Sequence, residues 1–218
     1  MIRGLIFDMD GVLVDNAQIH TLAWQQLGKE AGIDLRPEAV RAVFGQRNRE
    51  MMAALLGVSL NVEEQALLAR RKETLYRQLM APVLKPTPGA IDFLKRTKNS
   101  GFKTAVATSG PIENTDLVLD GLKIRPLFDT IVTGGDVARG KPDPEIFLLA
   151  AQRLDLPASE CLVFEDSAAG IEASFRAGCL CIALATTHTP QELQEYPAAR
   201  IISDFTQLTV CDLSTLDK

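Results

Sequence analysis

The sequence is poor in cysteine and has no long apolar run, and both shortages exclude a class of protein. It contains four cysteines in 218 residues, and Cys179 and Cys181 form a C-x-C pattern inside an apolar stretch. This pattern predicts buried, reduced thiols on opposite faces of a strand rather than a disulfide framework. The apolar runs fall far short of the roughly 18 residues that a membrane span needs, so we expect no membrane partner.

A strong positive charge is also absent. The formal net charge is -5, and Arg70-Arg71-Lys72 is the one short basic cluster in an otherwise scattered distribution. The sequence therefore lacks the stripe of basic residues that a nucleic-acid-binding surface needs. The chain reaches a strand-like segment within two residues of Met1, which leaves no room for a signal peptide. With 46% apolar and 23% charged residues, the composition is that of a globular protein, which we expect to be cytoplasmic.

Short apolar runs bounded by turn residues predict buried strands. In the second half of the chain they alternate with stretches of helical length. Strands that alternate with helices favour a parallel sheet with helices on both faces, a Rossmann-like α/β core. The predicted strands are 2–7, 104–107, 130–132, 161–164, 179–184 and 200–202, and the predicted helices are 112–122, 144–154 and 167–177.

The alternation breaks once, after the first strand. Residues 15–85 contain helical patterns and no convincing strand, with Gly32, Gly45 and Gly57 dividing them into four pieces. We therefore predict an inserted all-helical cap at 15–85 and a catalytic core made of 1–14 and 86–218. Asp15 is the expected N-cap of the first cap helix.

Polar side chains follow the predicted strands at their carboxyl ends, where open parallel sheets bind ligands. They are Asp8 and Asp10 after the first strand, Thr108 and Ser109 after the second, Lys141 after the third, and Glu165 and Asp166 at the fourth. So many carboxylates at one edge would repel each other without a cation. Mg²⁺ fits because it prefers oxygen ligands and often uses one or two carboxylates plus substrate phosphate.

This set of residues predicts phosphoryl transfer. Asp8 is the expected nucleophile on phosphorus, and Asp10 is the expected general acid and base. Thr108 and Lys141 would hold the phosphoryl oxygens in the transition state. Any one of these short motifs is often structural, but together they supply one coherent site for phosphate and metal.

The same segments, in the same order, resemble the haloacid dehalogenase superfamily over nearly the whole chain. The resemblance rests on Asp8-Met9-Asp10-Gly11-Val12-Leu13, on Thr108, on Lys141 in Gly140-Lys141-Pro142-Asp143-Pro144, and on Glu165-Asp166. It implies an aspartyl-phosphate intermediate and Mg²⁺ held by Asp8, the Asp10 carbonyl and the acidic pair Glu165-Asp166. Metal-free dehalogenases of the superfamily lack the second aspartate, which is present here as Asp10.

The cap is expected to choose the substrate. In the branch that resembles β-phosphoglucomutase, His20 and Lys72 match cap residues that reach the active site, and Gly45-Gln46 begin a segment that resembles the specificity loop. With Ser109 these are the candidate substrate-binding residues. The alternatives are a histidine in the core of the cap and a lysine on a solvated helix face. The loop has no clear match to the mutase's arginine.

We therefore expect a phosphatase of a small phosphorylated metabolite, with sugar phosphates as the first candidates. The alternative is phosphoryl transfer between sugar hydroxyls, as in β-phosphoglucomutase. A phospho-acceptor signalling switch is more remote, because such modules are about half this length and lack a helical insertion. The expected partner is a small-molecule phosphate ester, and the expected assembly is a monomer or weak homodimer.

Overall fold

The computed structural model describes residues 1–43, 45–56, 61–214 and 216, and its core is a six-stranded, fully parallel sheet. The strand order is β3-β2-β1-β4-β5-β6, the doubly wound order of Rossmann-like folds. All six predicted strands are present, with ends that differ by at most two residues. Their bounds are β1 Gly4–Phe7, β2 Lys103–Ala107, β3 Thr130–Val132, β4 Cys161–Glu165, β5 Leu180–Leu184 and β6 Arg200–Ile202.

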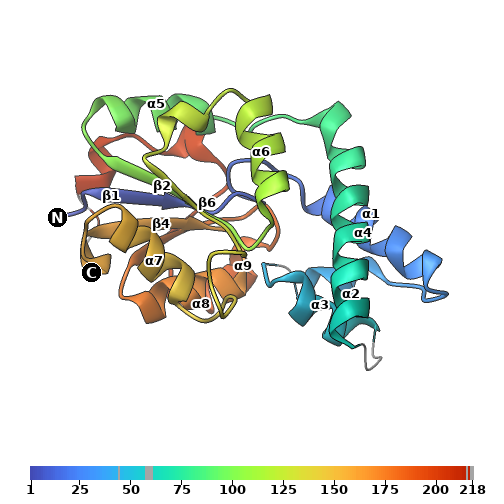
Figure 1. The fold of residues 1–218 in the computed structure, drawn as a ribbon. Helices are drawn as coiled ribbons and strands as arrows, with labels where there is room; N and C mark the ends of the chain where they lie inside the picture. Colours follow the sequence, from blue (N-terminus) through green and yellow to red (C-terminus); the bar gives the residue numbers. More distant parts are fainter. Residues whose placement is uncertain (44, 57–60, 215, 217–218) are drawn as a thin grey trace.

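Helices cover both faces of the sheet, as predicted. The pleat sends Leu5 and Phe7 of β1 to one face and Ile6 to the other. Leu5 and Phe7 pack against residues of helices α5 and α6, whereas Ile6 packs against residues of helices α7 and α8. Figure 1 shows these two helix pairs on opposite sides of the sheet. Their bounds are α5 Ala90–Asn99, α6 Ile112–Gly121, α7 Glu145–Arg153 and α8 Ala168–Ala177, followed by the short α9 Pro190–Leu193.

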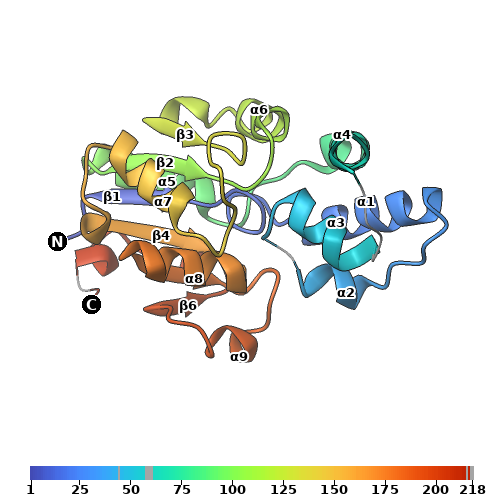
Figure 2. The ribbon, with the colours of Figure 1, turned by 60° about the horizontal axis from the view of Figure 1, so that its bottom comes forward.

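The insertion after β1 is helical and lies beyond one end of the sheet, beside the core (Figures 1 and 2). It consists of α1 Ala17–Glu30, α2 Pro37–Arg41, α3 Asn48–Leu56 and α4 Val62–Met80, the four predicted pieces. Trp24 and Leu27 of α1 and Leu75 and Tyr76 of α4 are buried in it. The predicted break at Gly57 lies outside the described residues. In the described part of the chain, no helix is long and apolar enough to cross a membrane.

The start of α1 corrects one prediction. Asp15 is exposed and is not the N-cap; that position belongs to Asn16. The Asn16 side chain makes no capping bond, because its hydrogen bonds go to Asp10, Tyr76 and the Gly11 amide. Asn16 therefore stabilises the residues that follow β1 instead of capping the helix that it precedes.

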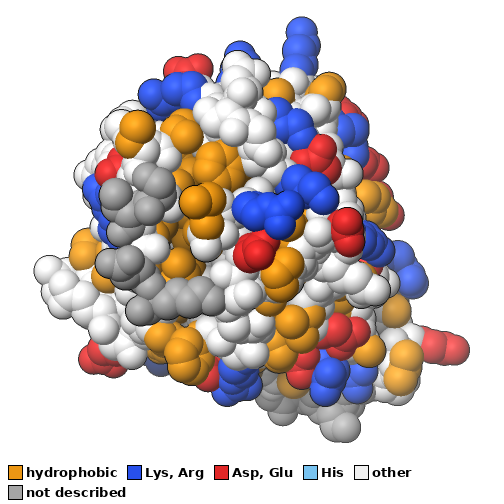
Figure 3. Space-filling view, turned by 90° about the vertical axis from the view of Figure 1, so that its left-hand side faces the viewer, with side chains coloured by type: hydrophobic (Ala, Val, Ile, Leu, Met, Phe, Trp, Pro, Cys, Tyr) orange, Lys and Arg blue, Asp and Glu red, His pale blue; other side chains and the backbone are white. Residues whose placement is uncertain are grey.

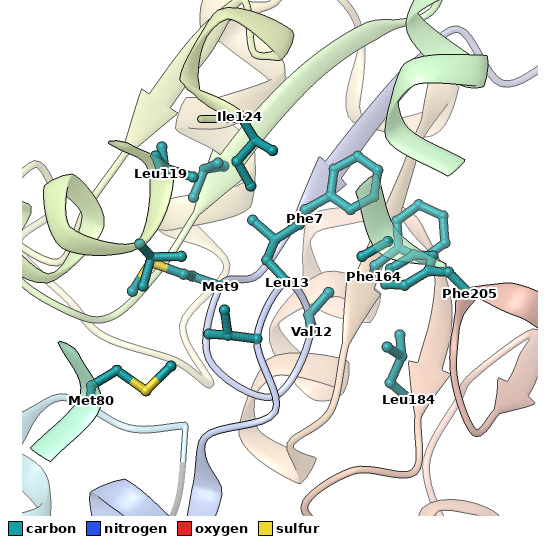
Figure 4. Packing of buried hydrophobic residues seen from close by; sticks show 14 of the residues in the cluster. Phe7, Met9, Val12, Leu13, Met80, Leu119, Ile124, Phe164, Leu184 and Phe205 are labelled. Atoms are coloured by element: carbon teal, nitrogen blue, oxygen red, sulfur yellow. The ribbon is translucent and has the colours of Figure 1, made fainter. Parts of the chain in front are cut away.

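A cluster of phenylalanines fixes the first strand in place (Figure 4). Phe7 stacks on Phe164 of β4 with ring centroids 4.6 Å apart, and Phe205 lies 5.3 Å from Phe164. All three are fully buried, and each contributes about 1.5–3 kcal/mol by leaving water. Because Asp8 follows Phe7 directly, this packing holds the backbone of the candidate nucleophile.

The face of the core that lies opposite the cap carries charges of both signs. Figure 3 shows Lys and Arg side chains interspersed with Asp and Glu and with small apolar areas. This mixed surface covers the amino ends of the strands, away from the polar residues that the sequence singled out.

Candidate active site

The sheet brings the predicted motifs together at its carboxyl edge. β1 pairs with β2 on one side and β4 on the other, so Asp8 stands between Thr108 and Glu165. In a doubly wound sheet the reversal of strand order beside the first strand opens a crevice for ligands. The loop after β3 adds Lys141 to the same place.

Lys141 connects the nucleophile candidate to the acidic pair. Its Nζ donates to Asp8 Oδ1 at 2.7 Å and to Glu165 Oε1 at 2.5 Å, with Ala107 O at 3.5 Å. Burial favours the neutral amine, but the carboxylates of Asp8 and Glu165 outweigh it and raise the pKa of Lys141. The side chain is therefore a buried ammonium aimed at the carboxylate that would attack phosphorus.

Glu165 is fully engaged by the protein. Its Oε2 accepts from the Asp166 and Ser167 amides and from the Ser167 hydroxyl, at 2.8–2.9 Å. A Cβ on Gly170 would meet the Glu165 carboxyl at 1.9 Å, so this glycine is required for the close approach. With both oxygens occupied, Glu165 orients Lys141 and the start of α8.

Asp8 and Asp166 are the carboxylates with the greatest need of a cation. Burial, with repulsion from Glu165, raises the pKa of Asp8 to about 8 and that of Asp166 well above its usual range. Asp166 lies against Gly11, where a Cβ would meet its Oδ2 at 1.9 Å, and it accepts from the Thr187 hydroxyl. A divalent cation between Asp8 and Asp166 would lower both pKa values.

This donor set fits Mg²⁺ better than a metal that needs a protein cage. The described residues contain no cluster of three or more His, Cys, Asp or Glu side chains that could hold a metal. Mg²⁺ requires fewer, because it is commonly bound by one or two carboxylates together with substrate phosphate and water. Two buried carboxylates beside the buried Lys141 ammonium are such a set.

Asp10 lies in a different environment from Asp8. Its Oδ1 accepts from Asn16 Nδ2 at 2.6 Å and from the Tyr76 hydroxyl at 3.4 Å, and it lies 3.2 Å from His20 Nε2. Burial alone would raise its pKa, but His20 and Asn16 outweigh burial and lower it to about 2. Two carboxyl groups two residues apart thus differ in opposite directions from an ordinary aspartate: the pKa of Asp8 is raised and that of Asp10 is lowered.

His20 links Asp10 to Lys72. Lys72 Nζ lies 2.9 Å from His20 Nδ1 and donates to Glu73 Oε1 at 3.0 Å. An ammonium can only donate, so Nδ1 accepts, and the network assigns the ring proton to Nε2, facing Asp10. Lys72 is 2% exposed, and the alternative that it lies on a solvated helix face is wrong.

A small cavity between core and cap contains most of the predicted residues. Its volume is about 40 Å³, which has room for a few waters. Lys141, Glu165 and Asp166 lie outside its lining, with Lys141 bonded to Asp8. The lining residues are Asp8, Asp10, His20, Trp24, Gly45, Gln46, Asn48, Met51, Lys72, Glu73, Thr108, Ser109 and Gly110.

The cap loop rests directly on the core. Ser109 Oγ donates to Gly45 O at 2.9 Å, and Gly45 has a φ of 88° and lies against Ser167, where a Cβ would be 2.2 Å from Oγ. Arg47 Nη1 donates to Ala138 O at 3.0 Å. These contacts close the cavity over Asp8.

Sequence reasoning missed Asn16, Tyr76, Glu73 and Asn114. Asn16 and Tyr76 bond Asp10, while Asn114 Nδ2 donates to Glu73 Oε2 at 2.6 Å. The one available signal was helical spacing on α4, which places Tyr76 four residues after Lys72 and so on the same face. Asn114 carries no comparable sign, because its contact joins the core to the cap across 41 residues.

The fold and the site define a capped Rossmann-like enzyme. The model of the haloacid dehalogenase-like hydrolases matches residues 2–178, and the chain belongs to this family. It thus has the sheet and inserted helical cap that the sequence predicted.

Within this family, the chain is similar to two curated phosphatases and to a solved structure of a β-phosphoglucomutase. The chain is 32% identical over 215 residues to the 5-amino-6-(5-phospho-D-ribitylamino)uracil phosphatase of Arabidopsis thaliana, covering 98% of this chain but 57% of that protein. It is 32% identical to a phosphorylated carbohydrates phosphatase of Thermotoga maritima, covering 81% and 82% of the two chains. A β-phosphoglucomutase structure from Clostridium difficile superposes with a TM-score of 0.89, at 28% identity, covering 98% and 96%.

Proposed function

We propose that this protein is a Mg²⁺-dependent phosphatase that hydrolyses a small phosphorylated metabolite through an aspartyl-phosphate on Asp8. The observation that carries the proposal is the buried Lys141 ammonium 2.7 Å from Asp8 Oδ1, beside the ionised Asp10. Phosphatases among the relatives support the same reaction, and one named for carbohydrates supports sugar phosphates as substrates.

In the first step Asp8 attacks phosphorus and the leaving oxygen takes a proton from Asp10. Lys141 and the Thr108 hydroxyl, which also accepts from the Gly110 amide at 3.1 Å, would neutralise and orient the phosphoryl oxygens. Asp8, Asp166 and the Asp10 carbonyl would hold Mg²⁺, which supplies the positive charge that lets a carboxylate approach a phosphate. Glu165 acts through Lys141, which it orients.

In the second step water attacks the aspartyl-phosphate and Asp10 accepts its proton. With a pKa of about 2, Asp10 is ionised in the closed site and is ready for this step. Its earlier role as an acid needs a proton, which the charge of an incoming phosphate would favour by raising the Asp10 pKa. The 3.2 Å contact with His20 Nε2 positions Asp10 for both steps.

The cap controls access in this proposal. A cavity of about 40 Å³ is too small for a sugar phosphate, so α1–α4 must move away from the core for binding and for release. The contacts of Gly45 and Arg47 with the core re-form on closure and exclude bulk water, which strengthens the electrostatic interactions inside.

Phosphoryl transfer between sugar hydroxyls, as in β-phosphoglucomutase, is the second candidate. It would use the same residues of the core as hydrolysis does. The TM-score of 0.89 with such a structure and the buried His20–Lys72 pair support it. In that case a sugar hydroxyl, rather than water, would take the phosphoryl group from Asp8.

The test is a panel of sugar phosphates incubated with purified protein, with phosphate release and product NMR as readouts. We expect repeated turnover to free phosphate with Mg²⁺, loss of turnover in EDTA, and no turnover in Asp8→Asn. Conversion of β-glucose 1-phosphate to glucose 6-phosphate without free phosphate would favour the mutase. A single stable labelling event would favour a signalling switch, and full activity in Asp8→Asn would overturn both enzymatic assignments.

A further inference from the structure

The cap side of the cavity carries almost no available positive charge. Among the lining residues that the structure describes, Lys72 supplies the one ammonium. Its Nζ is already 3.0 Å from Glu73 Oε1 and 2.9 Å from His20 Nδ1. Its side chain is 3% exposed, so water does little to screen the pairing with Glu73.

Glu73 is held in place from three sides. Lys72 and Asn48 Nδ2 donate to Oε1, the latter at 2.6 Å, and Asn114 Nδ2 donates to Oε2 at 2.6 Å. Arg77 Nη1 donates to Asn114 Oδ1 at 3.0 Å, which turns the amide nitrogen of Asn114 toward Glu73. Burial would raise the pKa of Glu73, but Lys72 and His20 outweigh it and the pKa is lowered, so the carboxylate is ionised.

The two ends of the cavity therefore differ in charge. At the core end, the Lys141 ammonium lies just behind Asp8, to which it donates at 2.7 Å, and would serve one phosphoryl group. At the cap end, the Glu73 carboxylate is paired with the Lys72 ammonium at 3.0 Å and offsets its charge. A second phosphate at the cap end would have to break the Lys72–Glu73 pair or lie beside a buried carboxylate, and either is unfavourable.

Neutral hydroxyl groups fit the cap end better. The Asn48 amide and Gln46 line it, and both are able to donate and accept hydrogen bonds. Trp24 lines it too, and its indole Nε1 is buried with no hydrogen-bond partner among the described residues. A buried donor of this kind gains from a ligand that supplies an acceptor.

We propose that Glu73 restricts the enzyme to monophosphate esters with an uncharged, hydroxylated leaving group, and excludes substrates that carry a second phosphate. This inference rests on the proposed function and deepens it. It also separates hydrolysis from mutase transfer, because a hydroxyl of a sugar monophosphate that accepts the phosphoryl group from Asp8 becomes part of a bisphosphate.

The test compares kcat/KM for a monophosphate with that for the matching bisphosphate. Two pairs serve as probes: fructose 1-phosphate with fructose 1,6-bisphosphate, and glucose 1-phosphate with glucose 1,6-bisphosphate. We expect wild type to prefer the monophosphate at least tenfold, and Glu73→Gln to lower that ratio at least tenfold by freeing Lys72. Glu73→Asp keeps the charge and should keep the preference. Glu63→Gln, the same change at an exposed position of α4, is the matched control.

Equal turnover of both members of a pair by wild type would overturn the proposal, as would a ratio in Glu73→Gln equal to that in Glu63→Gln. If Glu73→Gln fails a thermal unfolding test, Asn48→Arg adds a cation to the same wall, and an unchanged ratio there would count equally against the proposal. Calorimetric titration of Asp8→Asn with the same pairs measures the selection without turnover. If no ester releases phosphate, the proposed function is overturned. The preference of the site for monophosphates over bisphosphates can still be measured by this titration.

Discussion

Without metal, Asp8 should make the folded protein less stable as the pH rises. Asp8 is 6% exposed, and burial raises the pKa of its carboxyl from 3.8 to about 8. Between these values the unfolded chain has ionised Asp8 while the folded chain keeps the proton, so the folded state binds more protons. The contribution of Asp8 to the free energy of unfolding is therefore largest below about pH 4 and is lost progressively up to about pH 8.

The size of the effect follows from the pKa shift. At 1.36 kcal/mol per pH unit, the three units between pH 5 and pH 8 correspond to at most about 4 kcal/mol. Relaxation around a buried carboxyl reduces this limit, and we expect ~2–4 kcal/mol. Mg²⁺ should reverse the trend, because it binds the ionised carboxylate and stabilises the folded state by mass action.

Urea unfolding at pH 5 and pH 8 in EDTA measures the effect, with Asp8→Asn as the control that lacks the titrating carboxyl. The free energy of unfolding of wild type minus that of the variant should fall between the two pH values. The comparison cancels titrating groups that lie far from Asp8. A difference that stays constant within ~0.5 kcal/mol, or that rises with pH, would refute the reasoning.

Three further substitutions test the site. Lys141→Met should lower kcat/KM about 10²–10³-fold and, in EDTA, the free energy of unfolding by ~3–5 kcal/mol; wild-type values of both would contradict its assigned role. Arg47→Ala removes the donor to Ala138 O and should speed amide hydrogen exchange in the loop around Gly45, whereas unchanged exchange would mean that Arg47 does not hold the cap. Tyr76→Phe removes the hydroxyl 2.6 Å from Asn16 Nδ2 and should cost ~1 kcal/mol in urea unfolding; no cost would show that the bond is not formed.

The strands and the catalytic motifs could be predicted because local patterns specify them. A continuous apolar run, buried along its whole length, with a polar residue at its end describes β1 and Asp8 without reference to the rest of the chain. Helix α5 shows the limit of that reading. It follows Pro88 and Gly89, has buried Phe93, Leu94 and Thr97, and was not among the predicted helices although its spacing was available in the sequence.

The interactions that shape the cap side of the site could not be predicted locally. Glu73 meets Asn114 only because α4 of the cap reaches α6 of the core, and no periodicity encodes that approach. Asn16 shows a different difficulty. Its place before α1 favours a helix cap, but the partly buried Asp10 carboxylate accepts a stronger, charge-assisted hydrogen bond from its side chain. Tertiary contacts overrode the local preference in both cases.

The central claim is that Asp8 carries the phosphoryl group during turnover. Rapid acid quench of the wild-type protein with Mg²⁺ and a turned-over sugar phosphate, followed by peptide mass spectrometry, tests it directly. The account predicts a transient phosphoryl adduct on the peptide that contains Asp8, formed at least as fast as free phosphate appears, and no adduct or turnover in Asp8→Asn. Phosphate release without any adduct, together with turnover by Asp8→Asn, would contradict it.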